Sequence, residues 1–300
     1  MTDRSTVPPT TVRLNDPQRG IFSLTLACFF LAANDAAAKW ATQSLPVGEV
    51  IFIRGAFAMV AVVIYAWLGP GLGRLRVVNW RGQWIRGLAM AIATFFFVAS
   101  LALLPLATAI SFMFTVPIFT ALVVPMLLGE VVGFRRWAAI VVGFAGVIVL
   151  VRPTGEGIGW IALVPLAAAA FSGFRDAFTR RLADTETPLA ILFFSMTLET
   201  LLGLASLVYE RRMPDFDTVL VLLLAAVVFG LAQFFTIDAF RRAEAATVAP
   251  FRYTLLLWAG LWGYLIWGDV PDEWTVGGAA IIMACGLYIL FYESRRVRSS

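Results

Sequence analysis

The sequence predicts an all-α integral membrane protein, with ten transmembrane helices arranged as two inverted five-helix repeats around a central cavity. Three observations lead to this fold class: the composition, a series of apolar segments of membrane-spanning length, and a likeness between the two halves of the chain. Hydrophobic residues make up 60% of the 300 residues, charged residues make up 14%, and the mean hydropathy is +0.86. Globular domains are about 45–50% apolar and about 25% charged. The apolar excess is therefore expected to face lipid.

The apolar segments have the length that a membrane-spanning helix needs, which is about 20 residues for about 30 Å of hydrocarbon. Short turns rich in charge, glycine or proline separate them, and runs such as 139–150 and 219–230 are continuously apolar. A membrane β-strand would instead alternate polar and apolar residues over about ten positions, so helices are expected. The expected helices span 20–40, 47–68, 83–103, 107–127, 135–151, 157–180, 188–209, 217–240, 245–267 and 274–292.

The arginines between the segments predict the orientation of the protein. Positively charged residues concentrate on the cytoplasmic side of a membrane protein. Sixteen arginines fall on the side that holds both termini and three on the opposite side. We therefore expect cytoplasmic tails at 1–19 and 294–300, and a multi-pass protein of the inner (plasma) membrane. The net charge of +4 reflects this topology, and no nucleic-acid partner is expected because the arginines mark helix ends instead of forming one basic patch.

The absence of several residue types excludes much chemistry. The chain has no histidine, Lys39 is its only lysine, and Cys28 and Cys285 are its only cysteines. The usual zinc, haem and iron–sulfur ligand sets cannot be assembled from these residues. Lys39 follows Ala38, so the chain has no G-x-x-x-x-G-K-[ST] phosphate-binding loop. We expect no cofactor, no metal, no direct use of ATP, and no enzymatic activity.

The second half of the chain repeats features of the first. "GIFSLTLACFFLAANDAAAKW" from Gly20 is similar to "GIGWIALVPLAAAAFSGFRDAFTRR" from Gly157, and in each an acid precedes a base by four residues (Asp35/Lys39 and Asp176/Arg180). The turn at 128–130 matches the turn at 267–269. The repeats are expected at 20–152 and 157–293. Because each has an odd number of helices, the second copy enters from the opposite side of the membrane. The alternative is that apolar segments resemble one another by composition alone.

These features resemble the EamA-type members of the drug/metabolite transporter superfamily over residues 20 to 293. Within that group, "AANDAAAKW", "RGLAMAIATFFFVASLALLPLATA" and "AEAATVAPFRY" are similar to a branch with S-adenosylmethionine carriers and amino-acid exporters. The resemblance implies secondary transport through a central cavity lined mainly by the first, third, fourth, sixth, eighth and ninth helices.

Several charged residues fall inside the predicted helices, where each costs about 2.5–3.5 kcal/mol on insertion scales. We predict two gates that close alternately around the cavity. The outer gate consists of Asp35, Lys39 and Arg54, and the inner gate of Arg175, Asp176, Asp238 and Arg252. The alternative is that the two acid–base pairs four residues apart only stabilise their own helices near the headgroups.

Other polar and aromatic residues are candidates for substrate contact. Asn34 adjoins Asp35, and Gln233 lies between the two levels together with Glu199, which could instead form a structural interhelical hydrogen bond. Arg252 with Asp238 or Asp176 could bind the two charges of an amino acid. Phe95 and Tyr253 fall on helices that the resemblance assigns to the cavity wall, where aromatic rings can stack or hold a cation.

The sequence leaves three candidate functions. The first is export of amino acids or similar small metabolites by alternating access, and the second is uptake or exchange of S-adenosylmethionine. The third is an intramembrane enzyme, for which the chain offers no histidine base, metal-ligand cluster or G-x-S-x-G motif. The expected partners are a small-molecule substrate and the lipid bilayer, and the expected assembly is a monomer or a homodimer.

Overall fold

The regular elements of the protein are helical throughout the part of the chain that the computed structural model describes, which comprises residues 16–69, 71–128, 134–151, 159–182, 185–242 and 245–299. The helices of the first half are α1 (Pro17–Ala41), α2 (Val47–Leu68), η1 (Leu72–Leu75), α3 (Trp80–Leu103), α4 (Leu106–Met113), α5 (Val116–Leu128) and α6 (Phe134–Val151). Those of the second half are η2 (Gly159–Ala162), α7 (Leu163–Leu182), α8 (Pro188–Ser206), α9 (Phe216–Arg242), α10 (Ala245–Val248), η3 (Ala249–Tyr253), α11 (Thr254–Trp267) and α12 (Glu273–Ser299).

Helical segments are present at each of the ten expected spans. Within the described residues, seven segments are long and apolar enough to cross a membrane, and two shorter apolar helices span Trp137–Val151 and Glu273–Tyr288. The predicted all-helical membrane fold is confirmed. The Leu-Gly-Glu turn expected at 128–130 lies largely outside the described residues, as does the side chain of Arg180.

The fourth and ninth expected helices are each interrupted once. The fourth consists of α4 and α5, and the ninth of α10, η3 and α11. Pro117 lies at the start of α5 and Pro250 lies in η3. Proline has no backbone N–H and fits the first turn of a helix, so each proline marks a place where a new helical segment begins.

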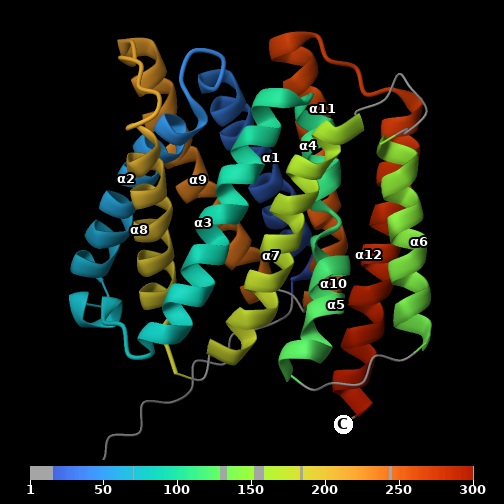
Figure 1. Ribbon diagram of the computed structural model, residues 1–300. Coiled ribbons are helices and arrows are strands. Elements are labelled where there is room, and N and C mark those ends of the chain that lie inside the picture. Colours follow the sequence, from blue (N-terminus) through green and yellow to red (C-terminus); the bar gives the residue numbers. More distant parts are fainter. Residues whose placement is uncertain are drawn as a thin grey trace, which may run out of the picture.

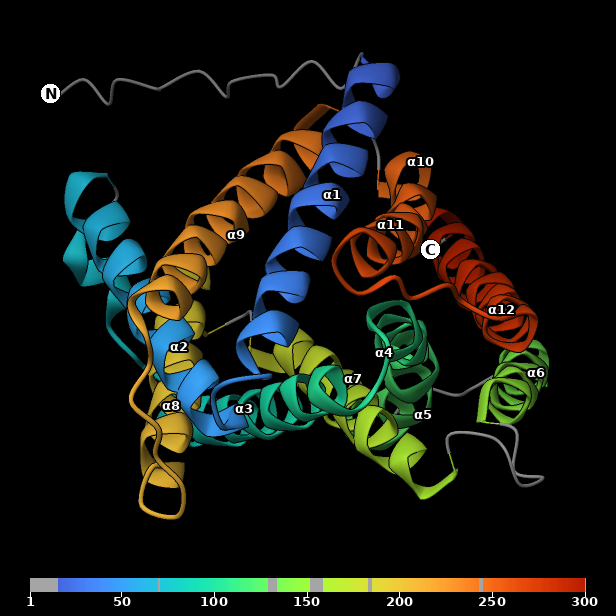
Figure 2. The same ribbon diagram turned by 90° about the horizontal axis from the view of Figure 1, so that it is seen from above.

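The two halves are related by inversion. The N-terminal end of α1 and the C-terminal end of α12 lie at the same end of the bundle, and α7 runs in the opposite direction to α1 (Figure 1). The helix contacts show the same symmetry, in which α1, α2, α3 and α6 of the first half correspond to α7, α8, α9 and α12 of the second. The contact of α1 with α9 corresponds to the contact of α7 with α3, while α2 packs on its own counterpart α8 and α6 packs on its own counterpart α12. Figure 2 shows the α2–α8 and α6–α12 pairs on opposite sides of the bundle, with the other helices between them.

Aromatic contacts repeat in the same way. Phe30 and Phe171 each lie five residues before the aspartate of their helix. Phe30 stacks on Phe235 of α9 with ring centroids 5.8 Å apart, and Phe171 stacks on Phe96 of α3 with centroids 6.4 Å apart. The duplication is therefore visible in side-chain geometry as well as in helix order.

The breaks of the fourth and ninth helices meet each other. Phe114 lies between α4 and α5, and Tyr253 ends η3; their ring centroids are 4.9 Å apart. The residues around them match, because Phe112-Met113-Phe114-Thr115 corresponds to Phe251-Arg252-Tyr253-Thr254. This contact between equivalent residues places both breaks at the approximate two-fold axis that relates the halves.

Glycines allow α6 and its counterpart α12 to approach closely. A Cβ atom at Gly146 of α6 would meet Ile281 of α12, and a Cβ atom at Gly278 of α12 would meet the backbone of Gly146. Small residues favour such helix contacts in membranes. The main core of the molecule consists of small and aliphatic side chains from both halves, such as Ala36, Ile110 and Ile282.

Candidate functional site

Arg54 and Glu199 form an ion pair in the interior of the bundle. Nη2 of Arg54 in α2 lies 3.7 Å from Oε1 of Glu199 in α8, and the two side chains are 19% and 8% exposed. Charged side chains at membrane depth are rare, and they pair with one another or face a water-filled cavity. This pair is the centre of the candidate site.

Close packing of α2 on α8 brings the pair together. A Cβ atom at Gly55, the residue after Arg54, would overlap the side chain of Thr200, the residue after Glu199. Gly203, one turn further along α8, would in the same way meet the backbone of Gly48 and Phe52. Because these glycines let the two backbones approach, a side chain on α2 can reach a carboxylate on α8.

Asp35 of α1 is the second carboxylate near Arg54. The carboxyl group of Asp35 interacts electrostatically with the guanidinium of Arg54. Oδ1 of Asp35 accepts a hydrogen bond from Nδ2 of Asn34 at 3.1 Å, and both residues are buried. Three helices thus contribute to this end of the site, and two acidic side chains on different helices flank one arginine.

Arg175 and Asp176 of α7 form the next contact. Nε and Nη2 of Arg175 lie 2.9 Å and 2.7 Å from Oδ1 of Asp176, and Nη1 of Arg175 lies 3.0 Å from the sulfur of Met90 in α3. Arg175 also acts electrostatically on Glu199. The two contacts therefore belong to one series of alternating charges: Asp35, Arg54, Glu199, Arg175 and Asp176.

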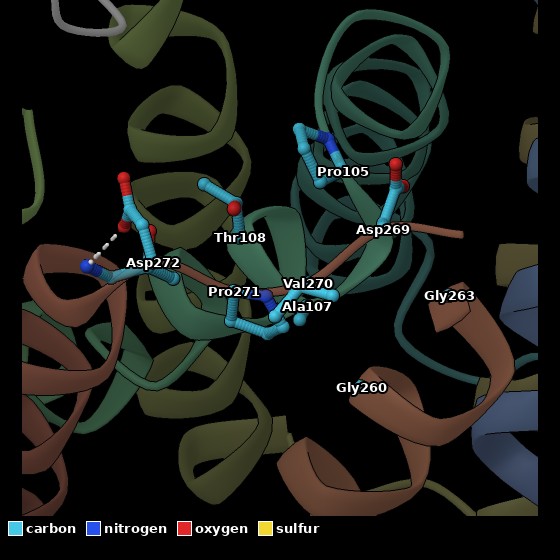
Figure 3. A pocket seen from close by; sticks show the side chains of 10 residues that line it. Pro105, Ala107, Thr108, Gly260, Gly263, Asp269, Val270, Pro271 and Asp272 are labelled. Atoms are coloured by element: carbon cyan, nitrogen blue, oxygen red, sulfur yellow. Dashed lines mark hydrogen bonds between the residues drawn. The ribbon is translucent and has the colours of Figure 1, made fainter. Parts of the chain in front are cut away.

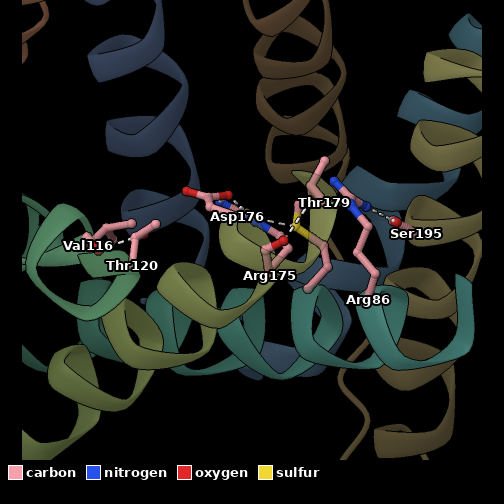
Figure 4. A network of polar contacts seen from close by, with 8 residues as sticks. Arg86, Val116, Thr120, Arg175, Asp176, Thr179 and Ser195 are labelled. Carbon is pink, nitrogen blue, oxygen red and sulfur yellow. Dashed lines mark hydrogen bonds and ion pairs between the residues drawn. The ribbon is translucent and has the colours of Figure 1, made fainter. Parts of the chain in front are cut away.

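Arg86 of α3 extends this series. Its Nε donates a hydrogen bond to Oγ1 of Thr179 at 2.8 Å, and its Nη1 donates to Oγ of Ser195 in α8 (Figure 4). Arg175 and Asp176 both act electrostatically on Arg86. We call the six charged residues from Asp35 to Arg86 the charge ladder; it crosses the interior through α1, α2, α8, α7 and α3.

The equivalent aspartates of the two repeats have different surroundings. Asp35 is buried, with 6% of the whole residue exposed, whereas Asp176 is only partly buried and its side chain is 45% exposed. Asp176 lies on the same face of α7 as Ala169 and Ser172, which are buried, so this exposure is toward the interior of the bundle. One aspartate is enclosed while its counterpart is accessible.

Lys39 does not join Asp35 and Arg54, contrary to the outer gate that the sequence predicts. Its Nζ donates hydrogen bonds to the carbonyl oxygens of Leu101 at 3.0 Å and Leu104 at 2.6 Å, and lies 5.2 Å from the ring centre of Trp267. In a continuous helix the amide of residue 105 would bond to the carbonyl of Leu101, but Pro105 has no N–H. Lys39 therefore caps the end of α3.

The predicted inner gate is also divided. Asp238 accepts hydrogen bonds at 2.7 Å from both Ser23 of α1 and Arg242 of its own helix. Arg252 is exposed, and in the described part of the chain it forms no ion pair with Asp176 or Asp238. Of the four residues expected there, the structure brings only Arg175 and Asp176 into contact.

The remaining candidates lie at separate places. Gln233 is exposed on α9, Phe95 makes an edge-to-face contact with Phe96, and Tyr253 takes part in the contact between the two helix breaks. Tyr253 also fits against Gly286, where a Cβ atom would collide with its hydroxyl group.

Sequence reasoning missed Arg86 and Ser195 and assigned Glu199 no gating role. Arg86 lies near the start of the third expected helix, but α3 begins earlier, at Trp80, so Arg86 lies further inside the helix than expected. Its spacing of three and four residues from the interior positions Gln83 and Met90 could have indicated an inward side chain. No local pattern shows that α8 lies opposite α2, which is what pairs Glu199 with Arg54.

A cavity of about 120 Å³ lies at the end of the bundle opposite the termini (Figure 3). The start of α4, two glycines of α11, the turn before α12 and the start of α12 line it, with Thr108, Asp269, Asp272 and Thr275 as its polar side chains. Oδ1 of Asp272 accepts a hydrogen bond from the backbone amide of Thr275 and so caps α12. Asp269 acts electrostatically on Lys39, which places Lys39 near this end.

Comparison with known proteins identifies the family. The sequence profile described as the EamA-like transporter family matches residues 18–152 and again residues 158–292. The chain belongs to the EamA-like transporter family. The two matches coincide with the two halves of the fold, so an EamA-like unit corresponds to one inverted repeat. The protein is therefore a multi-span membrane transporter.

Several relatives cover nearly the whole chain. A riboflavin transporter of Rhizobium johnstonii is 31% identical over 94% of this chain and 95% of its own. An S-adenosylmethionine uptake transporter of Rickettsia prowazekii is 26% identical over 91% and 94%, and a pseudopaline exporter of Pseudomonas aeruginosa is 28% identical over 89% and 94%. These relatives support a transporter of small metabolites.

A solved crystal structure shares the fold. It superposes with a TM-score of 0.62 at 21% sequence identity and covers 93% of this chain and 98% of its own. At this identity the likeness concerns the fold alone.

Proposed function

We propose that this EamA-like protein is a secondary transporter that exports amino acids or similar small metabolites by alternating access. The unequal exposure of Asp35 and Asp176 is the observation that carries the proposal. In a protein built from inverted repeats, exchanging the conformations of the two halves exchanges the open and closed sides. An enclosed Asp35 and an accessible Asp176 correspond to one of these two states.

In this proposal the charge ladder takes the place of two separate gates. Asn34, Asp35 and Arg54 close the substrate path at its end away from the termini, and Arg175 and Asp176 line its open end. Asp238, Arg252, Gln233, Phe95 and Tyr253 contact the substrate or hold the moving helices, and Lys39 stabilises the end of α3. The termini are cytoplasmic, because sixteen arginines lie on their side of the membrane, so the described state is open to the cytoplasm.

S-adenosylmethionine is the second candidate substrate. The relatives named as its uptake transporters support it, together with the stacked aromatic pairs between α1 and α9 and between α3 and α7. Aromatic faces attract cations such as a sulfonium and can stack on an adenine ring. The rings lie on the helices that carry Asp35 and Asp176, so a cationic, aromatic substrate would find both kinds of partner there.

Counterflow into proteoliposomes tests the proposal. Purified protein is reconstituted with unlabelled substrate inside, and the accumulation of radiolabelled neutral amino acids, S-adenosylmethionine or riboflavin is measured. We expect amino-acid accumulation that is lost in the Arg54→Met variant and kept in the control Arg76→Met, because Arg76 is exposed outside the bundle. Accumulation of S-adenosylmethionine or riboflavin alone would replace the proposed substrate, and accumulation of none would refute the proposal.

A further inference from the structure

Arg86 is a cation that neutral groups hold in place. Its two hydrogen-bond acceptors are the hydroxyl oxygens of Thr179 and Ser195. Each hydroxyl gives its own proton to a backbone carbonyl four residues earlier in its helix, Thr179 to Arg175 at 2.6 Å and Ser195 to Ile191 at 2.7 Å. A hydroxyl has only one proton to donate, so the lone pairs of both are left for Arg86. The two residues orient the guanidinium but do not neutralise it.

The nearby carboxylate is already engaged. Oδ1 of Asp176 accepts a hydrogen bond from Nε of Arg175 and forms an ion pair with its Nη2. Arg86 forms no ion pair within the described part of the chain. The next carboxylate of the charge ladder, Glu199, pairs with Arg54, so the end formed by Arg86, Arg175 and Asp176 has two positive charges and one negative charge. A positive charge at membrane depth is costly unless an anion accompanies it.

The position of Arg86 gives a ligand access to this charge. Figure 4 shows Arg86, Thr179 and Arg175 in a row beside the α3 and α7 ribbons, with Asp176 next to Arg175. The side chains of Arg175 and Asp176 are 22% and 45% exposed, so solvent reaches this end of the charge ladder. Three residues before Arg86, Gln83 is fully buried, and neither polar atom of its side chain has a partner in the described part of the chain.

We propose that Arg86 binds an anionic group of the transported substrate, a carboxylate or a phosphate, with Arg175 as the second cation. This inference rests on the proposed transport function and narrows its substrate class to metabolites that carry at least one negative group. A guanidinium has five N–H donors in a planar fork that matches the oxygens of carboxylate and phosphate. Thr179 and Ser195 engage Nε and Nη1 of Arg86, and its other N–H donors are left for the substrate.

A binding experiment tests the anion site without a known substrate. The thermal unfolding of the purified protein in detergent is followed during titration with acetate or inorganic phosphate, at constant ionic strength set with chloride. We expect both anions to raise the unfolding temperature of the wild type and of the control variant Arg81→Gln, whose arginine is exposed on the same helix. In Arg86→Gln the apparent affinity should fall at least about tenfold, the typical effect of losing a charge-assisted hydrogen bond, while Arg86→Lys should retain part of it.

Equal stabilisation of all variants by the anions, or no stabilisation of the wild type, would overturn the inference.

A transport competition experiment distinguishes failure of the anion site from failure of the proposed transport function. L-methionine should compete with the transported probe at least about tenfold better than L-methioninamide, which lacks the carboxylate, and Arg86→Gln should abolish this preference. Equal competition by acid and amide would refute the anion site and leave transport standing. Anion binding that depends on Arg86, without transport of any probe, would refute the proposed function and leave the site standing.

Discussion

Arg54 and Glu199 illustrate why charged residues persist inside this membrane protein. A buried ion pair adds little stability compared with an apolar pair, but removing one partner leaves a charge without compensation. The nearby Asp35 adds a second carboxylate around the same arginine. An arrangement that is costly to break and adds little stability when formed is expected where a protein exchanges partners, which is what a transport cycle requires.

Single and double substitutions of this pair should behave differently. The Arg54→Met variant should lose about 3–5 kcal/mol of stability, because Glu199 remains buried without its partner. The double variant Arg54→Met/Glu199→Leu should recover most of this loss but still fail to transport. Denaturant unfolding in detergent and counterflow measure the two properties, with Arg76→Met as control. A double variant that transports normally would contradict the role of the pair.

Lys39 should matter for stability and not for transport. The Lys39→Met variant loses two charge-assisted hydrogen bonds to the end of α3, each of which contributes about 1.5–3 kcal/mol. Lys39→Arg should keep part of this stabilisation. Unfolding and counterflow of both variants test this. If the Lys39→Met variant lost transport while its stability was unchanged, Lys39 would act in the outer gate that the sequence predicts, and the capping role would be contradicted.

At the scale of single residues, the sequence identifies which charged residues lie in the membrane, but it does not identify their ion-pair or hydrogen-bond partners. Asp35, Arg54, Arg175 and Asp176 are recognisable because they interrupt apolar segments. Lys39 is misleading because it follows Asp35 by one helical turn, whereas its long side chain reaches a carbonyl that Pro105 leaves free on another helix. The partner of Arg54 depends on the docking of α2 on α8, and no spacing within α2 encodes it.

The crossing of α2 and α8 determines whether the charge ladder can form. A methyl group at Gly55 would overlap the side-chain hydroxyl of Thr200. The Gly55→Ala variant should therefore lose about 1–3 kcal/mol of stability, as overpacked cores do, and transport should fall with it. Thr200→Ala should restore most of both, because it removes the overlapping atom. Gly230→Ala is a matched control, since a Cβ atom there meets nothing within 4 Å.

Loss of stability in Gly55→Ala that Thr200→Ala does not relieve would contradict this description of the crossing. Unfolding and counterflow of the two single variants and the double variant provide the comparison. At the scale of elements, hydropathy predicts the number and order of the helices well, and Pro117 and Pro250 mark the two interruptions in the structure. The contact between Phe114 and Tyr253 could not be predicted, because it exists only once both halves have docked.

The inverted duplication organises the molecule as a whole. The sequence indicates it through matched acid–base spacings, and the structure repeats it in helix direction, in exchanged helix pairs and in the stacked rings of Phe30–Phe235 and Phe96–Phe171. The departure from symmetry is as informative as the symmetry, because a molecule with two identical halves would expose Asp35 and Asp176 equally. Sequence cannot reveal which half adopts which conformation, since both states use the same residues.

Thiol labelling from the two sides of the membrane tests the central claim most directly, namely that Asp35 and Asp176 are equivalent positions reached from opposite faces. Single-cysteine variants Asp35→Cys and Asp176→Cys are made in a Cys28→Ala/Cys285→Ala background, since the two native cysteines are buried and unpaired. A membrane-impermeant maleimide should label the Asp176→Cys variant only from the side of the termini, and the Asp35→Cys variant only from the other side and more slowly. Labelling of both variants from the same side would contradict the account.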